Sequence, residues 1–234
     1  MNHSQAVLEN NYSGKELEYQ KTQEEKFMEW EIAKDKICMR VIGPKQKQDI
    51  GRNAFLIRFL NLSIMIYAWE DGCNNKILVI TKDDVRMWGI QKEEIIRQAF
   101  SNTKKNSRFV LKNLAGYLCD MIPNISESER NQIESAEKNP VYVLSTIGGS
   151  YGASAILFTD IFQRVCDDFG CDLFILPSSV HELILIPDFG ARWTSEELLR
   201  VVKEVNQTVT EDNSMLADNV YYYAREVGKV EIAA

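Results

Sequence analysis

A hydroxyl, an imidazole and a carboxylate, the three groups of a nucleophilic triad, occur within five residues of this chain. Ser178 and Ser179 are followed by His181 and Glu182. A triad needs the base to lie between the nucleophile and the orienting acid. Adjacent residues of a strand point to opposite faces, so His181 and Glu182 should diverge, and no G-x-S-x-G nucleophile elbow is present. We therefore expect no catalytic residue here, but a structural turn at which Ser178, Ser179 and His181 could contact a ligand or a partner.

A glycine-rich segment, residues 148–152, lies between an expected strand and an expected helix. It reads Gly148, Gly149, Ser150, Tyr151 and Gly152. Exposed backbone N–H groups in such a connection can hold a phosphate. The segment matches neither the Walker sequence nor G-x-G-x-x-G, and no lysine follows closely. Two interpretations stay open, namely ligand binding at Gly148 and Gly149, or a plain connection whose glycines serve the turn.

A short basic segment lies just before the middle of the chain, with Lys104, Lys105, Arg108 and Lys112. Three of these residues recur every fourth position and would form a basic stripe if residues 104–112 were helical. A stripe this short is usually a solvated helix face when the rest of the protein is not basic. We therefore do not expect nucleic acid as a partner.

The charge of the chain is unevenly distributed. The net charge is −7, and residues 151–234 hold 6 Lys and Arg against 14 Asp and Glu, whereas residues 1–150 are close to neutral. Affinity for nucleic acid comes mainly from the neutralisation of phosphates, which an acidic surface cannot supply. A protein partner is expected instead, and a basic one would suit the acidic half.

The cysteines and histidines do not form a recognisable metal motif. None of the five cysteines belongs to a C-x-x-C pair, and the sequence has only two histidines. We expect reduced structural thiols, no metal and no cofactor. The sequence also lacks the apolar run of about 18 residues that a membrane helix needs and the pattern of a secretory signal. A cytoplasmic protein that does not enter a membrane is therefore expected.

The order of apolar segments predicts an α+β fold. We expect a flexible tail over residues 1–14, a helix and hairpin region over 15–140, and an α+β region over 141–234 that shares one core with the preceding region. From residue 141 the order is strand, helix, strand, strand, helix, strand, strand. This order favours an antiparallel or mixed sheet with helices packed on one face.

Individual elements can be predicted within this outline. Two apolar runs that meet at Pro177 predict a β-hairpin over residues 172–187. Apolar residues spaced by three and four predict a helix from Ala155 to Phe169. Further helices are expected at residues 45–60 and 106–122.

From about Phe27 to its end, the chain resembles an uncharacterised domain-of-unknown-function family of gut Firmicutes, often encoded near mobile genetic elements. Four segments carry the resemblance: Leu62–Trp69; Ile80-Thr81 with Met87-Trp88-Gly89 and Glu93-Glu94; Tyr142–Ser145 with Gly152–Leu157; and Leu173–Pro187 with Leu216-Ala217-Asp218. The resemblance implies no established activity. It adds Asp218 to the candidate binding residues.

The sequence thus favours a cytoplasmic binding protein without turnover. We expect a protein-interaction accessory factor of a mobile element, and interference with a host defence system would fit such a role by analogy. The alternative is a small-ligand, nucleotide-binding or hydrolytic domain that uses the 148–152 loop and the 176–182 turn. The candidate binding residues are Ser178, Ser179, His181, Gly148, Gly149 and Asp218.

Overall fold

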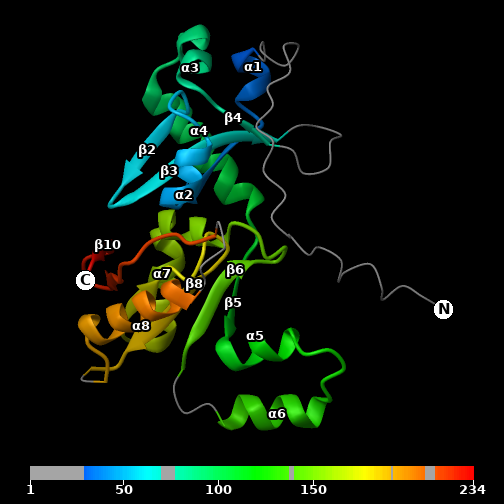
Figure 1. Ribbon diagram of the computed structural model, residues 1–234, viewed down its shortest axis with the longest axis vertical. Helices are drawn as coiled ribbons and strands as arrows, with labels where there is room; N and C mark the ends of the chain where they lie inside the picture. The colour runs from blue at the N-terminus through cyan, green and yellow to red at the C-terminus, as the bar shows by residue number, and fades with distance from the viewer. Residues whose placement is uncertain (1–28, 70–76, 137–139, 191, 209–213) are drawn as a thin grey trace, which may run out of the picture.

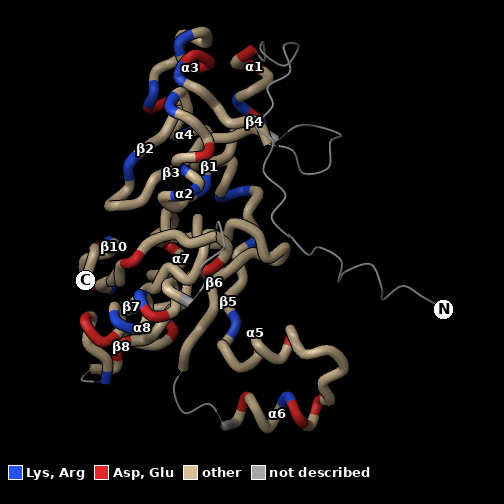
Figure 2. Tube along the Cα trace, in the orientation of Figure 1, with Lys and Arg blue, Asp and Glu red and all other residues tan. Residues whose placement is uncertain are grey.

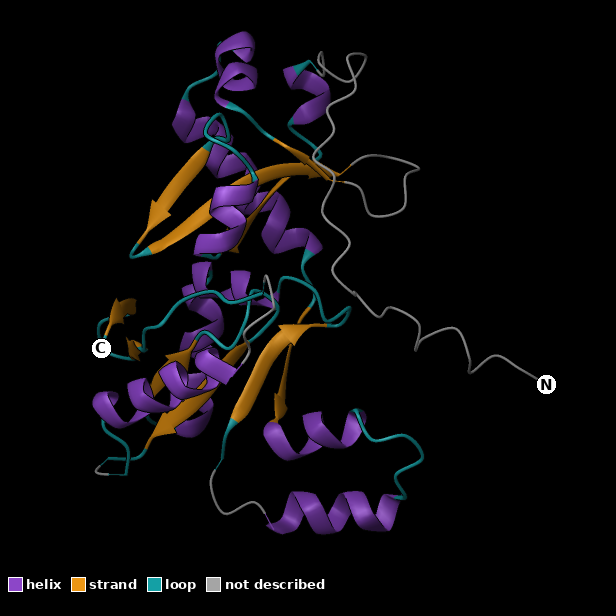
Figure 3. Ribbon diagram, in the orientation of Figure 1, coloured by secondary structure: helices purple, strands orange, loops and turns teal. Residues whose placement is uncertain are grey.

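The computed structural model describes residues 29–69, 77–136, 140–190, 192–208 and 214–234 (Figure 1). Two antiparallel sheets follow one another along the long axis of the molecule, with helices packed around both (Figure 3). The α+β class predicted from the sequence is therefore confirmed. The predicted tail over residues 1–14 and most of the polar segment that follows it lie outside the described residues.

The first sheet contains four strands built around a long central one. These are β1 (Ile37–Ile42), β2 (Leu56–Phe59), β3 (Leu62–Trp69) and β4 (Ile77–Val79). Strand β3 pairs with each of the other three. The predicted helix at residues 45–60 is wrong, because α2 (Pro44–Asp49) ends after six residues and the chain turns at Gly51, whose φ is +80°. The following residues pair as β2, in which Phe59 lies opposite Leu62.

Three further helices accompany this sheet, namely α1 (Trp30–Ala33), α3 (Lys82–Trp88) and α4 (Lys92–Asn106). Helix α4 is fastened to β1 by side chains near its carboxyl end. The amide of Asn102 donates to the carbonyl of Ile37 at 2.8 Å, and the hydroxyl of Thr103 accepts from the N–H of Met39 at 2.8 Å. These bonds fix the end of α4 against the strand.

The second sheet has six strands in the order β10-β9-β7-β8-β6-β5, all antiparallel. Its central pair, β7 (Asp172–Leu176) and β8 (Leu183–Asp188), confirms the hairpin predicted at residues 172–187. The other strands are β5 (Phe109–Asn113), β6 (Tyr142–Thr146), β9 (Tyr221–Ala224) and β10 (Lys229–Ile232). The sheet therefore begins at Phe109, well upstream of residue 141.

The predicted helix at residues 106–122 is only partly correct. Phe109–Asn113 instead forms the edge strand β5, which pairs with β6. Asn113 then caps α5 (Leu114–Asp120) by accepting from the N–H of Gly116 at 2.8 Å, and this bond marks the change from strand to helix. Helix α6 (Glu127–Ala136) packs on α5, and both lie at the end of the molecule remote from the first sheet (Figure 1).

Helices cover both faces of the second sheet. The 3₁₀ helix η2 (Gly152–Leu157) and α7 (Thr159–Phe169) lie on the face to which Leu173 and Ile175 point. The sequence predicted helices on one face of this sheet. Helix α8 (Ser195–Thr208) covers the opposite face in addition, and packs Leu198 and Val202 on Phe174. The core on the η2 side also contains β1 residues, so the two sheets share it.

The helix predicted from Ala155 begins later than expected, at Thr159. The preceding residues form the 3₁₀ helix η2, which packs closely between the two sheets. A Cβ atom on Gly152 would lie 2.5 Å from the carbonyl oxygen of His181 and 2.5 Å from the Cα of Ser145. Only glycine permits this approach. The regular α-helix then starts at Thr159 and ends at Gly170, whose φ is +70°.

Acidic and basic residues are interspersed on several elements of the surface, including α6 and α8 (Figure 2). Within the described ranges, no helix has the length and apolar character required to cross a membrane.

Candidate functional site

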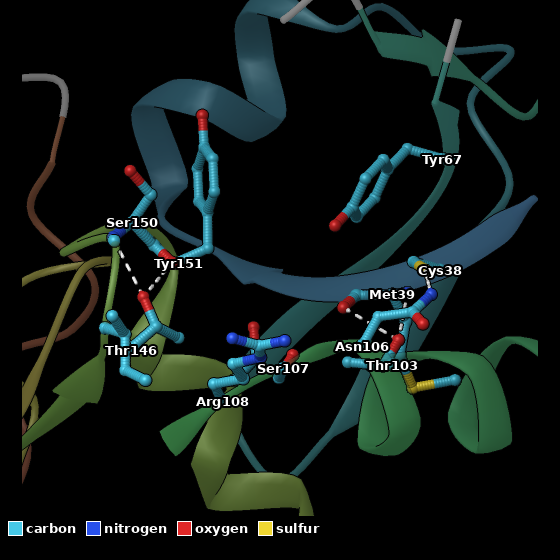
Figure 4. A pocket seen from close by; sticks show the side chains of 13 residues that line it. Cys38, Met39, Tyr67, Thr103, Asn106, Ser107, Arg108, Thr146, Ser150 and Tyr151 are labelled. Atoms are coloured by element: carbon cyan, nitrogen blue, oxygen red, sulfur yellow. Dashed lines mark hydrogen bonds between the residues drawn. The ribbon is translucent and has the colours of Figure 1, made fainter. Parts of the chain in front are cut away.

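A pocket of about 340 Å³ lies where the two sheets meet (Figure 4). We call it the inter-sheet pocket. Its walls come from β1, β3, the carboxyl end of α4 and the connection from β6 to η2. It is lined by Cys38, Met39, Tyr67, Thr103, Asn106, Ser107, Arg108, Thr146, Ile147, Gly148, Ser150, Tyr151 and Ser154. This set combines hydroxyl, amide and guanidinium groups with apolar and aromatic side chains, and none of these described lining residues is acidic.

A buried arginine lies beside the pocket. Arg40 is on β1, its side chain is only 2% exposed, and it is adjacent to two rings that line the pocket. Its guanidinium carbon is 3.9 Å from the ring centre of Tyr151 and 5.2 Å from that of Tyr67. The atoms Nε and Nη1 of Arg40 have no hydrogen-bond partner within the described part of the chain.

This arrangement leaves the charge of Arg40 incompletely compensated. Burying an unpaired cation costs several kcal/mol. This is similar to the cost of removing one partner from a buried ion pair. Contact with an aromatic face returns about 2 kcal/mol when the pair is desolvated. The N–H groups of a guanidinium lie in its plane and each needs an acceptor, which an aromatic ring does not replace. The site therefore lacks an acceptor for at least two N–H groups.

Tyr67 adds a protonated phenol to the pocket. Burial raises the pKa of its hydroxyl above the ordinary value of a tyrosine, and the nearby Cys38 acts in the same direction. The phenol is therefore neutral at physiological pH and can donate a hydrogen bond. It lies across the pocket from Tyr151, as Figure 4 shows.

Tyr151 links the pocket to the 176–182 turn. Its φ is 56°, a left-handed conformation that is uncommon for a bulky residue. Its N–H donates to Nδ1 of His181 at 3.3 Å, and the two rings lie 5.4 Å apart between centres. Because Nδ1 accepts this bond, a neutral imidazole of His181 carries its proton on Nε2.

Four of the five backbone N–H groups of the glycine-rich segment, those of residues 149–152, are already hydrogen-bonded within the protein. The N–H of Gly149 donates to the carbonyl of Thr146 at 2.9 Å, and the N–H of Ser150 donates to the hydroxyl of Thr146 at 3.0 Å. The N–H groups of Tyr151 and Gly152 both bond to His181. Gly148 lines the inter-sheet pocket and Gly149 occupies the turn with φ of +66°. An anion in this region must therefore be bound by side chains.

The side chains of the 176–182 turn do not form a triad. Hydroxyls of Ser178 and Ser179 approach Oε1 of Glu182 at 3.5 and 3.3 Å, and the hydroxyl of Tyr117 donates to Oε2 at 3.1 Å. His181 instead contacts Tyr151, and its backbone N–H donates to the hydroxyl of Ser179 at 3.0 Å. The carboxylate thus gathers the hydroxyls while the imidazole contacts the next loop. This arrangement suits a fixed turn.

The other sequence candidates lie apart from the pocket. Asp218 is exposed and accepts a bond from the amide of Asn206 at 2.7 Å, which ties the end of α8 to the segment before β9. The conditional basic stripe is not formed, because residues 104–106 end α4 and residues 109–113 are a strand. Lys104 pairs with Asp160 and Lys112 with Asp120. Arg108 alone of the four lines the pocket.

Metal binding has little structural support in the described ranges. No group of three or more His, Cys, Asp and Glu side chains there is placed to hold an ion. Cys38, Cys119, Cys166 and Cys171 are free thiols, and Cys73 lies outside the described residues. Burial raises the pKa of Cys166 to about 12, so this thiol is protonated and unreactive at neutral pH.

A family model described as "Family of unknown function (DUF5688)" matches residues 3–225 of the chain. The chain belongs to this family. No curated protein and no solved structure matches it significantly. Membership of the DUF5688 family agrees with the resemblance inferred from the sequence at the level of a family of unknown function, and brings no known activity to the pocket.

Arg40, which lies beside the pocket, and Tyr67, which lines it, are residues that the sequence analysis missed. Arg40 is the one charged residue in the apolar run Ile37–Ile42. A charge in the middle of a run that reads as a buried strand is the signal that could have found it, since such charges are rare without a partner. Tyr67, inside a strand-like run, gives no such signal.

Proposed function

We propose that the protein is a binding protein that takes a small molecule into the inter-sheet pocket and does not convert it. This is the small-ligand alternative of the sequence analysis, moved from the glycine backbone to the side chains around it. The observation that carries the proposal is Arg40, a buried guanidinium beside the pocket with two nitrogen atoms that lack partners.

Binding without turnover is the version that the lining residues favour. The pocket offers hydroxyls of Ser and Thr and the thiol of Cys38 as nucleophiles. Nucleophilic catalysis needs a base within hydrogen-bond reach, usually His, Asp or Glu, and none of these types is among the described lining residues. A volume of about 340 Å³ is at the lower end of the range for ligand pockets, so the ligand should be small.

A thermal-shift screen with a small-molecule set of neutral, cationic and anionic metabolites tests this proposal. A ligand at 100 times its dissociation constant stabilises the folded state by about 2.7 kcal/mol, which shifts the melting temperature by several degrees. Hits are then titrated by calorimetry against Gly148→Trp. A Cβ on Gly148 meets open space, so this variant should fold while its indole fills part of the pocket.

Gln132→Phe is the matched control, because it places a ring on exposed α6. The proposal predicts that Gly148→Trp weakens the hits at least tenfold and Gln132→Phe leaves them unchanged. A screen without any hit, or hits that Gly148→Trp binds as well as the unmodified protein, would overturn it.

A protein partner is the second candidate function. The acidic character of residues 151–234 motivated it from the sequence, and α5 adds an observation. Leu118, Met121 and Ile122 are exposed near the carboxyl end of α5, with Met121 at 60%. Exposed apolar groups of this kind often mark interaction sites. Affinity purification with quantitative mass spectrometry tests the idea, since Met121→Glu should lose a partner that Gly148→Trp retains.

The cellular role that we propose for either kind of binding is that of an accessory factor of a mobile element, which includes interference with a host defence system. The resemblance described for the sequence supports this setting. Co-purification from a native host, with the element present and absent, tests it.

A further inference from the structure

We infer that the ligand of the inter-sheet pocket carries an oxyanion, a phosphate or a carboxylate, that Arg40 and Arg108 bind. This inference rests on the proposed function, because it names the chemical class of the ligand for the same pocket. Two observations support it, namely the unsatisfied guanidinium of Arg40 and the charge of the lining residues, and it requires that one aromatic ring can move.

The unsatisfied guanidinium defines the chemistry. Nε and Nη1 of Arg40 both need acceptors and have none within the described residues. Nε shares one edge of the planar guanidinium with Nη2, and Nη1 shares another edge with Nη2, so each unpartnered nitrogen lies on an edge with which arginine binds carboxylates and phosphates. A neutral ligand could accept the hydrogen bonds but would leave the buried charge uncompensated. An oxyanion provides both the acceptors and the charge.

The lining of the pocket also favours an anion. Arg108 is exposed on the segment between α4 and β5 and contributes a second guanidinium. Ser107, Ser150 and Asn106 offer neutral donors around it. The carboxyl end of α4 borders the pocket as well, and the basic residues of its last turn, Lys104 and Lys105, offset the negative end of the helix dipole. The described lining residues include no carboxylate that would repel the ligand.

Access to Arg40 requires the movement of one ring, because the guanidinium is 2% exposed. Tyr151 is the ring that we expect to move. It lies half-buried in a loop with a strained φ of 56°, whereas Tyr67 is buried within the central strand β3. Figure 4 shows the two rings on opposite sides of the pocket. The inference requires Tyr151, whose ring centre lies 3.9 Å from the guanidinium carbon, to turn aside so that a ligand in the pocket reaches Arg40.

Titration calorimetry at constant ionic strength tests the inference with four probes: inorganic phosphate, AMP, succinate and the neutral nucleoside adenosine. At least one of the three anions should bind, and adenosine should bind at least tenfold more weakly than AMP. Tighter binding of phosphate or AMP than of succinate assigns a phosphate ligand, and the reverse order assigns a carboxylate ligand.

Two variants connect the binding to the arginines. Arg40→Met removes the charge and leaves an unbranched apolar side chain, and Arg108→Met does the same at an exposed position where folding is not at risk. Each should weaken the anion at least tenfold, whereas Lys105→Met, an exposed cation outside the lining, should change it less than twofold. Binding that both arginine variants retain would overturn the inference, and so would a failure of all three anions.

The results also separate this inference from the proposed function. If the metabolite screen finds neutral or cationic ligands that Gly148→Trp loses, while the anions fail, the pocket binds a small molecule and the oxyanion inference is wrong. If no molecule binds in a manner sensitive to Gly148→Trp, both are wrong.

Discussion

The guanidinium of Arg40 lies 3.9 Å from the ring centre of Tyr151, in a buried position where two of its nitrogens have no hydrogen-bond partner among the described residues. Tyr151 in turn adopts a left-handed conformation and donates its N–H to His181. A charged residue, a strained residue and a histidine from three separate elements are thus connected at the junction of the two sheets. Such strain in native proteins is concentrated at functional sites.

If Arg40 serves a ligand, it should not stabilise the empty protein. Replacement of buried ions by apolar residues of similar volume is often neutral or stabilising by about 1–4 kcal/mol, and the lost aromatic contacts reduce that gain by about 2 kcal/mol or less. We therefore expect Arg40→Met to have a free energy of unfolding equal to or above that of the unmodified protein, as measured in urea. A loss of several kcal/mol would assign Arg40 to the fold.

The contact between η2 and the second sheet should require a glycine, without a Cβ atom, at position 152. Gly152→Ala places a Cβ 2.5 Å from backbone atoms of His181 and Ser145, which cannot yield without moving a strand. Overpacking of this kind costs about 1–3 kcal/mol or more, and we expect the upper end of this range. The matched variant Gly148→Ala meets open space and should change the melting temperature by less than a degree. Equal stability of the two variants would show that η2 is not held as described.

The bond between Tyr117 and Glu182 should give the protein a stability that depends on alkaline pH. Burial, and then the charge of Glu182, raise the pKa of Tyr117 to about 12 from 10.0. A phenol with a raised pKa in the folded state contributes stability that is complete below pH 10 and is lost as the pH rises towards 12. Because the phenol is partly exposed, we expect it to contribute only about 1 kcal/mol to the free energy of unfolding.

The measurement is the free energy of unfolding of Tyr117→Phe and of the unmodified protein at pH 8 and at pH 11.5. The variant should lose less stability over this interval, because it lacks the phenol of Tyr117. The other tyrosines titrate in both proteins and cancel in the comparison. A parallel loss in the two proteins would contradict the raised pKa of Tyr117.

The proposal of a basic protein partner makes a prediction about charge, for which the structure selects the residues. Asp167 accepts from Nε of Arg225 at 2.8 Å, and Glu197 caps α8 through Thr194, so neither can be reversed without local damage. Asp168 and Glu196 are exposed, and the carboxylate of Glu196 accepts a bond from its neighbour Ser195. Conversion of this pair to Lys should slow association several-fold at low salt, since opposite charges steer encounter.

The control is Asp35→Lys with Asp49→Lys, which makes the same charge change in the near-neutral half at two exposed sites. Association rates with the purified partner, measured by surface plasmon resonance at two salt concentrations, compare the two pairs. Equal rates would mean that the acidic half does not steer the partner.

The sequence predicted those elements whose hydrophobic pattern matches their environment. The strands at residues 172–187 are flanked by helices on both faces and read as continuous apolar runs, and the capping boxes at Thr81 and Thr194 begin α3 and α8. The strands β2 and β5 were predicted as helices. Both are short edge or near-edge strands that owe their conformation to pairing with β3 and β6, and such pairing outweighs local propensity.

The candidate site was predicted only in part, for a related reason. Gly148 and His181 were identified by local sequence, and the structure does place them near Tyr151. The role of the backbone N–H groups was not foreseeable, because their acceptors come from Thr146 and His181 after folding. Arg40 and Arg108 are 68 residues apart in the sequence, and the packing of α4 on β1 brings their segments to the same region of the fold.

The most direct test of the account is a nuclear magnetic resonance titration that follows the Nε–Hε signal of Arg40, assigned by its loss in Arg40→Lys. We predict a saturable shift of this signal on addition of AMP, phosphate or succinate, together with shifts of the backbone N–H of Tyr151 and of His181. An Arg40 signal that stays in place while a ligand saturates the protein, or while all three anions fail to bind, would contradict the claim that this buried guanidinium is a ligand-binding group.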